Sequence, residues 1–268
     1  MRARAGLWAV ATAVMAFVYL PLGVVALNSF NSDRTFGWPP PSLTMKWWQL
    51  AASAQGPRDA LVTSVKAGLG ATALALVLGT LLALALTRYA FFGREAISLL
   101  VVLPIALPGI VTGIALQSVI QNVLGPVFGI GAGLFTIIVG HATFCIVVVF
   151  NNVTARLRRF GASLEAASAD LGARPLTTFR LVTFPLLRSA LLAGALLAFA
   201  LSFDEIVVTT FTAGPGSPTL PIWIFNNLFR PNQAPVVNVV AVVLVLFSIV
   251  PVWLAQRLGD SSAAQSRL

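Results

Sequence analysis

The stretch that decides the fold runs from Ala96 to Ala155 and reads AISLLVVLPIALPGIVTGIALQSVIQNVLGPVFGIGAGLFTIIVGHATFCIVVVFNNVTA. It contains no charged residue. A membrane-spanning helix needs about 20 predominantly apolar residues, so the stretch is long enough for two spans. Small and helix-breaking residues mark the interruption between them, at Gly125, Pro126, Gly129, Gly131 and Gly133. The stretch therefore predicts two successive membrane helices.

The composition of the whole chain agrees with this interpretation. Of its 268 residues, 58% are hydrophobic and 9% are charged, and the mean hydropathy is +0.91. A soluble domain carries about 25% charged residues, so a soluble fold of this length would have too few charges to cover its surface. The net charge is +9, and the basic residues lie between the long apolar runs. This pattern favours basic membrane-flanking loops and argues against nucleic-acid binding.

The single cysteine, Cys145, excludes an intramolecular disulfide. It lies four residues after His141, so the two side chains share one helix face. Two ligands do not complete a tetrahedral zinc site. Structural packing is therefore favoured for both residues, and no metal is expected.

Six apolar stretches are long enough to span a membrane, which predicts an all-α polytopic protein with a single transmembrane domain over residues 1–268. The uncharged run from Ala5 to Leu27 is longer than the apolar region of a signal peptide, so it is expected to remain as the first span. The expected spans are residues 7–29, 64–87, 97–121, 132–153, 189–212 and 234–256. An even number of spans places both termini on the same side of the membrane.

The positive-inside rule sets the orientation of these spans. With both termini in the cytoplasm, twelve basic residues lie inside and four outside, and Lys66 lies near a helix start. The inner set is Arg2, Arg4, Arg88, Arg94, Arg156, Arg158, Arg159, Arg174, Arg180, Arg188, Arg257 and Arg267. The outer set is Arg34, Lys46, Arg58 and Arg230. We therefore expect a multi-pass protein with cytoplasmic termini.

The longest inner loop, residues 154–188, contains the pattern of a short amphipathic helix outside the membrane. Ser163 is expected to cap its start, and Glu165 falls in the first turn, where a carboxylate complements the helix dipole. Gly172 is expected to end it, with Pro175 following. Its apolar face consists of Leu164, Ala167 and Leu171. Two interpretations remain open: the helix docks in a groove on a cytoplasmic partner, or it only connects two spans.

The segment from Glu165 to Pro185 resembles the EAA loop of ABC importer permeases, a pattern of Glu-Ala-Ala, a glycine and an aliphatic-x-Leu-Pro ending. The matching residues are Glu165, Ala166, Ala167, Gly172, Val182 and Pro185, with Phe184 where leucine is usual. Counted back from Gly172, the usual glutamate position is held by Ala166, and Glu165 lies one residue early. One residue turns a side chain about 100° around a helix, so the family's salt bridge from this glutamate to the ATPase is in doubt here. Asp170, one turn along, is the candidate substitute.

The resemblance covers essentially the whole chain and implies the type I ABC importer permease fold in a bacterial inner membrane. It implies that the loop is a coupling helix seated in a cleft of the ATP-binding subunit. The implied partners are a dimer of ATP-binding cassette ATPases, a second permease subunit that is a different chain of homologous sequence, and an extracytoplasmic solute-binding protein. The residues implied in coupling are Glu165, Ala166, Ala167, Asp170, Gly172 and Pro185.

An acidic pair, Asp204 and Glu205, lies inside the otherwise apolar stretch Leu191–Phe211. An ionisable residue within a membrane costs about 2.5–3.5 kcal/mol on insertion scales, so it usually faces a partner or a water-filled path. Adjacent residues of a helix point about 100° apart, so we expect one acid toward the pathway and the other toward a neighbouring helix or subunit. A cation site, an interhelical hydrogen bond with one acid protonated, and a proton relay all remain open.

The sequence from Ser202 to Val208, followed by Thr219-Leu220-Pro221, resembles the spermidine/putrescine group of these permeases. The resemblance implies a polycationic solute, for which carboxylates along the path are suitable, with cation–π contacts from Phe203 and Trp223. Related permeases for iron or phosphonate carry similar sequences, and they are the alternative.

Motifs of catalysis and nucleotide binding are absent from the sequence. No Gly-x-x-x-x-Gly-Lys-Ser/Thr loop occurs, so ATP is expected to be bound and hydrolysed on a partner chain, and no cofactor is expected on this one. No Gly-x-Ser-x-Gly elbow occurs, which argues against an enzyme. A self-sufficient secondary transporter is the rival from another class, and inverted repeats, which would support it, are not evident.

Overall fold

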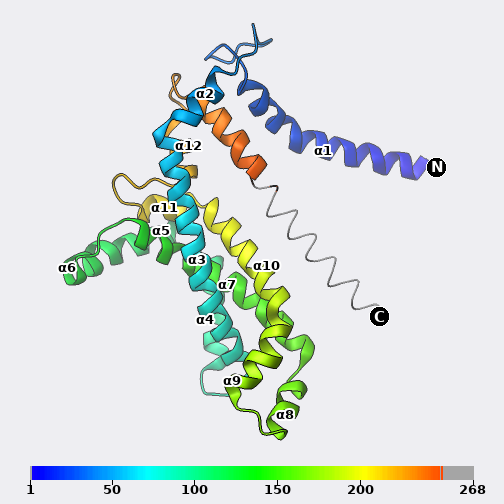
Figure 1. Cartoon of the computed structure of the whole chain (residues 1–268). Helices are drawn as coiled ribbons and strands as arrows, with labels where there is room; N and C mark the ends of the chain where they lie inside the picture. The colour runs from blue at the N-terminus through cyan, green and yellow to red at the C-terminus, as the bar shows by residue number, and fades with distance from the viewer. Residues whose placement is uncertain (1, 248, 250–268) are drawn as a thin grey trace. The chain divides into compact units, whose positions relative to one another are not determined.

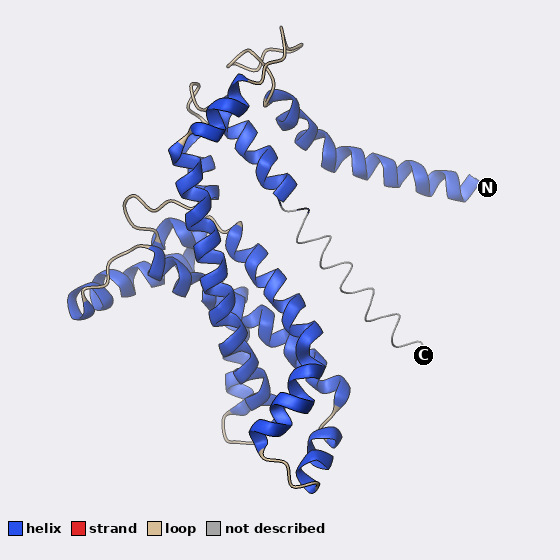
Figure 2. Ribbon diagram, viewed as in Figure 1, coloured by secondary structure: helices blue, strands red, loops and turns tan. Residues whose placement is uncertain are grey.

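The computed structural model describes residues 2–247 and 249, and helices dominate this part of the chain (Figures 1 and 2). The helices are α1 (Arg2–Asn28), α2 (Lys46–Ser53), α3 (Gln55–Arg88), α4 (Arg94–Ala106), α5 (Gly109–Val119), α6 (Gly125–Phe128), α7 (Leu134–Phe160), α8 (Ser163–Asp170), α9 (Pro175–Thr178), α10 (Phe184–Phe203), α11 (Val207–Thr212) and α12 (Leu220–Asn227). Two π-helical segments, η1 (Ile120–Leu124) and η2 (Phe179–Thr183), continue α5 and lead into α10. A further helix runs over Ala234–Phe247. The predicted all-α class is confirmed.

Five helical stretches are long and apolar enough to cross a membrane: Gly6–Asn28, Gln55–Arg88, Gly109–Phe128, Leu134–Phe160 and Pro175–Phe203. The apolar helix Ala234–Phe247 is shorter and coincides with the start of the sixth expected span, 234–256. The rest of that span, together with Arg257, Arg267 and the C-terminus, lies outside the described residues. The helix content is thus consistent with six spans.

The chain separates into two compact units. Among the described residues, one unit contains residues 2–59 and 223–247, and the other runs from Ala60 to Ile222. This division does not test the expected single transmembrane domain over residues 1–268, which stays a prediction. In the first unit, Trp47 is 3% exposed and donates its indole N–H to the carbonyl oxygen of Asn31 at 2.7 Å, which anchors α2 to the preceding loop.

The core of the unit Ala60–Ile222 lies where α3, α7 and α10 pack together. Ala71, Ala75 and Ala83 of α3 are fully buried there. A Cβ atom placed on Gly79 would lie 2.9 Å from the carbonyl oxygen of Ile146 in α7. Small residues along α3 therefore allow the backbones to approach closely, as is common in membrane helices.

The third expected span, 97–121, is wrong as one continuous helix. Helix α4 ends at Ala106, and α5 begins at Gly109 after two residues with extended ψ angles of 142° and 132°, Leu107 and Pro108. Proline lacks an N–H and disfavours helical geometry in the residue before it, so the helix stops here. The second helical stretch then continues through η1 to Phe128.

The fifth expected span, 189–212, is wrong at both ends. The helical course begins earlier, at Pro175, and is interrupted between α10 and α11 at residues 204–206. Segment η2 directly precedes Phe184 and Pro185. A proline ring would clash with the carbonyl four residues earlier in an α-helix, and the wider π-turn accommodates Pro185 without a break.

Candidate functional site

The helix predicted in the inner loop is α8, and it begins directly at Ser163. Ala162 holds the N-cap position, and no side chain caps the helix, so the expected capping role of Ser163 is wrong. The preceding helix α7 ends at Phe160, and Gly161, with a φ of +61°, turns the chain after it. With Ser163 as the N-cap, the first helical residue would be Leu164, so the observed helix begins one residue earlier than predicted.

The end of α8 forms a Schellman motif at Gly172. The Gly172 N–H donates to the Ala169 carbonyl oxygen at 2.8 Å, and the Ala173 N–H donates to that of Ser168 at 3.1 Å. Gly172 has a φ of +81°, which only glycine adopts without strain. The predicted helix stop is therefore present, whereas its role in coupling stays a prediction.

Glu165 points toward the rest of its own chain. Its Oε2 atom lies 2.7 Å from the Nε of Arg88, the last residue of α3. Its Oε1 atom accepts a hydrogen bond from the hydroxyl of Thr183 in η2 at 2.8 Å. Arg88 also donates from Nη2 to the carbonyl oxygen of Gly161 at 2.6 Å. The carboxylate thus joins α8 to α3 and to the helical course that leads into α10.

The remaining residues predicted for coupling are exposed. Ala166, Ala167, Asp170 and Gly172 lie on the outer surface of the α8 segment. Pro185, the second residue of α10, is also exposed. Two large apolar side chains accompany them, Leu164 at 49% exposure and Leu171 at 89%. The predicted set is therefore divided: Glu165 faces inward and the others are available to a partner.

The acidic pair lies in the break between α10 and α11 and not on a regular helix, so the expected separation of 100° is wrong. Glu205 Oε1 accepts a hydrogen bond from the Val208 N–H at 2.7 Å and thereby caps α11. Asp204 is exposed, and within the described part of the chain its carboxylate has no hydrogen-bond or ion-pair partner. Glu205 is therefore held by its own helix, and Asp204 is the free carboxylate.

His141 lies on α7 and contacts residues on both sides of this break, although only a packing role was expected for it. His141 is fully buried, with Nδ1 2.7 Å from Ser202 Oγ and Nε2 2.8 Å from Thr209 Oγ1. The Thr209 hydroxyl donates to the Glu205 carbonyl oxygen at 2.8 Å, so it accepts from Nε2–H. The Nε2–H tautomer with Nδ1 accepting from Ser202 satisfies all three groups. His141 therefore ties α10 and α11 together across the interruption.

The other side chains considered at this site have separate environments. Cys145 is buried, and its thiol donates to the Ala198 carbonyl oxygen at 3.3 Å. Phe203 is 6% exposed, and its ring stacks on Phe199 with centroids 5.6 Å apart. Trp223 belongs to the other unit, where a Cβ on Gly56 would lie 2.9 Å from its Nε1. The cation–π roles expected of Phe203 and Trp223 therefore stay predictions.

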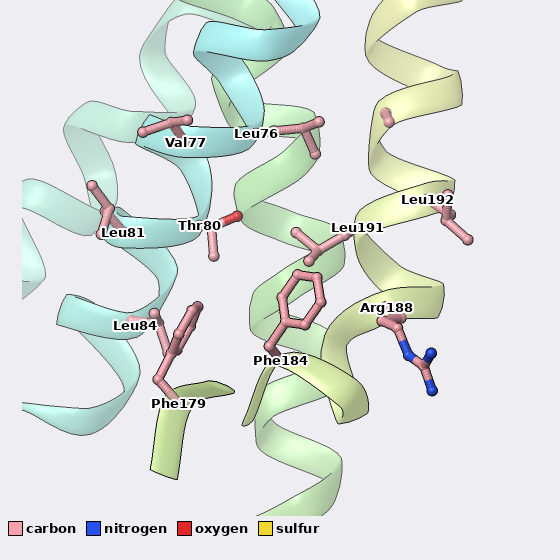
Figure 3. Close-up of a pocket in the computed structure, with 11 residues that line it drawn as sticks. Leu76, Val77, Thr80, Leu81, Leu84, Phe179, Phe184, Arg188, Leu191 and Leu192 are labelled. Carbon is pink, nitrogen blue, oxygen red and sulfur yellow. The ribbon is translucent and has the colours of Figure 1, made fainter. Parts of the chain in front are cut away.

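A cavity of about 600 Å³ lies between α3 on one side and η2 and α10 on the other (Figure 3). Figure 3 shows Leu76, Thr80 and Leu84 along α3, and Leu191 and Phe184 along α10. The one charged residue that lines it is Arg188. The guanidinium of Arg188 repels cations and the apolar walls offer an ammonium group no partner, so this cavity suits the expected polycationic solute less well than the break at Asp204 does.

A family model described as the inner membrane component of binding-protein-dependent transport systems matches residues 75–261. The chain belongs to this family. This chain is 34% identical to the spermidine/putrescine transport system permease protein PotC of Escherichia coli K12, over 92% of its own length and 91% of PotC. It is 31% identical to the putrescine transport system permease protein PotI of the same organism, over 85% and 81% of the two chains. The resemblance inferred from sequence is confirmed.

Two solved structures share the fold of this inner membrane component. One belongs to a bacterial ABC transporter that imports the polysaccharide alginate, with a TM-score of 0.72, 16% identity and coverage of 97% and 96%. The other is the MetNI methionine ABC transporter in inward-facing conformations, with a TM-score of 0.61, 18% identity and coverage of 82% and 99%. The all-helical ABC permease fold predicted from the sequence is confirmed, and the chain is a transport permease.

Sequence reasoning did not find three residues that organise these sites in the inner membrane component. Arg88 was counted only as an inner basic residue, Thr183 was not singled out, and His141 was assigned to packing without a partner. Each makes contacts with residues far away in the chain. No local sequence pattern predicts such contacts, although a lone histidine inside a membrane span indicates that a polar partner is near.

Proposed function

We propose that this inner membrane component is the permease subunit of an ABC importer that carries a polyamine, such as spermidine or putrescine, into the cytoplasm. The observation that carries the proposal is the 34% identity to PotC over 92% of the chain. The similar match to PotI, whose name also specifies putrescine, adds support.

The chemistry at the helix break supports a cationic solute. Asp204 ends α10 with its carboxylate exposed, and the last carbonyl groups of a helix carry partial negative charge. Both features attract an ammonium group. The phosphonate alternative is disfavoured, because the same carboxylate would repel an anion.

The surface of α8 supports energy coupling through a partner. We infer that an ATP-binding cassette dimer seats the exposed apolar side of α8, so that ATP is bound and hydrolysed by that partner and this chain holds no cofactor. A second permease and an extracytoplasmic binding protein complete the importer. In this arrangement both termini and α8 lie in the cytoplasm, as the distribution of basic residues indicates.

The experiment that tests this proposal is uptake by proteoliposomes containing the chain with its cognate ATPase, second permease and binding protein. ATP-dependent accumulation of labelled spermidine or putrescine is expected, with no accumulation when ATP is omitted. Accumulation of iron or a phosphonate in place of polyamines would contradict the polyamine proposal and identify that solute as the substrate. Uptake by the isolated chain along a proton gradient would favour a secondary transporter.

A further inference from the structure

The inner face of α8 is fixed by side chains from two separate membrane helices. The chain itself connects α8 to α7 through Gly161 and to α10 through the turn at Gly172. In the described part of the chain, the polar contacts that connect the α8 segment to α3 are those of Arg88: the ion pair with Glu165 and the hydrogen bond to the Gly161 carbonyl oxygen. A separate hydrogen bond, between Ser168 Oγ and Thr178 Oγ1 at 2.9 Å, closes the α8–α9 turn.

Both oxygens of Glu165 are already used. Oε2 pairs with Arg88 and Oε1 accepts from Thr183. The side chains of Arg88 and Glu165 are only 17% and 22% exposed, and Thr183 is 5% exposed. The cavity that these residues line measures about 10 Å³, which is no larger than a single water molecule requires. The Glu165 carboxylate is thus largely enclosed by contacts within its own chain.

We propose that Glu165 is an internal positioning residue that fixes α8 to the end of α3, and that it is not a contact to the ATPase. The inference rests on the proposed function for its readout in transport. When the ATPase moves α8, the Arg88–Glu165 pair carries that movement to α3 in addition to the movement that the chain carries to α10. The one-residue displacement of Glu165 from the usual EAA position is consistent with this inward direction, because it rotates the side chain by about 100°.

The assignment has a consequence for the ATPase interface. If the inward face of α8 belongs to Glu165 and Ser168, the docking surface consists of the exposed side chains of Leu164, Ala167, Asp170 and Leu171. Asp170 then supplies the free carboxylate of the coupling helix, since in the described residues its side chain has no partner.

Charge exchange between the two positions tests the pair. Arg88→Glu and Glu165→Arg each place two like charges together, and each is expected to lower uptake per ATP hydrolysed at least fivefold while the complex still copurifies. The double variant restores opposite charges and is expected to recover at least a third of the wild-type ratio. Arg94→Glu combined with Glu165→Arg is the matched control, because Arg94 is an exposed arginine at the start of α4, and it must not restore the ratio.

A second measurement separates this proposal from the proposed function, because it needs neither solute nor ATPase. Thermal unfolding of the purified permease pair is compared for the wild type, the two single variants and the double variant. Each single variant is expected to lower Tm by about 2–4 °C, the double variant less than the sum of the two. Strictly additive Tm changes would overturn the pair as an internal contact.

Binding of the ATPase gives a further check. If Glu165→Arg abolishes ATPase binding and the added Arg88→Glu change does not restore it, Glu165 contacts the ATPase and the proposal is wrong.

Discussion

The Nε2 atom of His141 lies 2.8 Å from the Thr209 hydroxyl, and this contact joins α7 to α11 just beyond the interruption that holds Asp204. The same ring contacts Ser202 on the other side of the interruption, at the end of α10. One side chain thus fixes both ends of the break, and the direction of the free Asp204 carboxylate depends on it.

Replacing His141 with leucine is expected to destabilise the permease by about 1–2 kcal/mol, since two interhelical hydrogen bonds are lost. The buried Ser202 hydroxyl loses its imidazole partner, whereas the Thr209 hydroxyl keeps its hydrogen bond to the Glu205 carbonyl oxygen. The measurement is thermal unfolding in detergent. His141→Gln, which keeps one donor and one acceptor, is the matched variant and is expected to lose less. Equal stability of His141→Leu and the wild type would show that the ring does not hold the break.

Replacing Asp204 with asparagine is expected to raise the KM for polyamine uptake about tenfold, equivalent to about 1.4 kcal/mol of lost attraction. Glu205→Gln is the matched variant, because its side-chain oxygen can still accept from the Val208 N–H. It is expected to change KM less than twofold. If the two variants exchange these behaviours, Glu205 faces the solute; if neither changes KM, the pair serves packing alone.

The membrane character and the approximate spans could be predicted from sequence because hydropathy is a local property. The interruptions within the third and fifth expected spans could not be predicted. Pro104 lies inside α4, whereas Pro108 ends it, although both stand in the same apolar stretch. The break at 204–206 contains neither proline nor glycine and is fixed by contacts with His141 in another helix.

The candidate coupling site shows the same division. The stop of α8 at Gly172 follows from a local preference and was predicted. The inward direction of Glu165 depends on Arg88, which is close in space and distant in sequence, and no periodicity within the loop identifies that partner. The outward direction of Ala167, Leu171 and Asp170 follows once the inward face is known.

Replacing Gly172 with valine is expected to uncouple ATP hydrolysis from transport. A left-handed backbone costs a residue with a Cβ about 1–2 kcal/mol, more for a β-branched one, so the turn after α8 changes conformation. No atom lies within 4 Å of a Cβ at this position, so the effect is conformational and not steric. Gly172→Asn, which tolerates this conformation, is the control and keeps a higher ratio of uptake to ATP hydrolysed. Normal coupling in Gly172→Val would contradict the role of the turn.

Replacing Gly79 with leucine is expected to impair folding of the permease in the membrane. A Cβ there would already lie 2.9 Å from the Ile146 carbonyl oxygen and 3.0 Å from the Val149 Cβ, so α3 and α7 must separate. Overpacking of this kind costs about 1–3 kcal/mol or more. Gly131→Leu is the control, with no atom within 4 Å of its Cβ. The measurement is the amount of protein inserted and extractable in mild detergent; similar yields for both variants would exclude close packing at Gly79.

Helix α8 is proposed to be the element that the ATPase binds on the cytoplasmic side of the membrane. The direct measurement is cysteine chemistry at Ala167→Cys, an exposed position on α8, in a protein whose single native cysteine is fully buried. In inverted membrane vesicles carrying the whole importer, a bifunctional thiol reagent is expected to link this residue to the ATPase subunit. Labelling only from the opposite side of the membrane, or a product without the ATPase, would contradict the account.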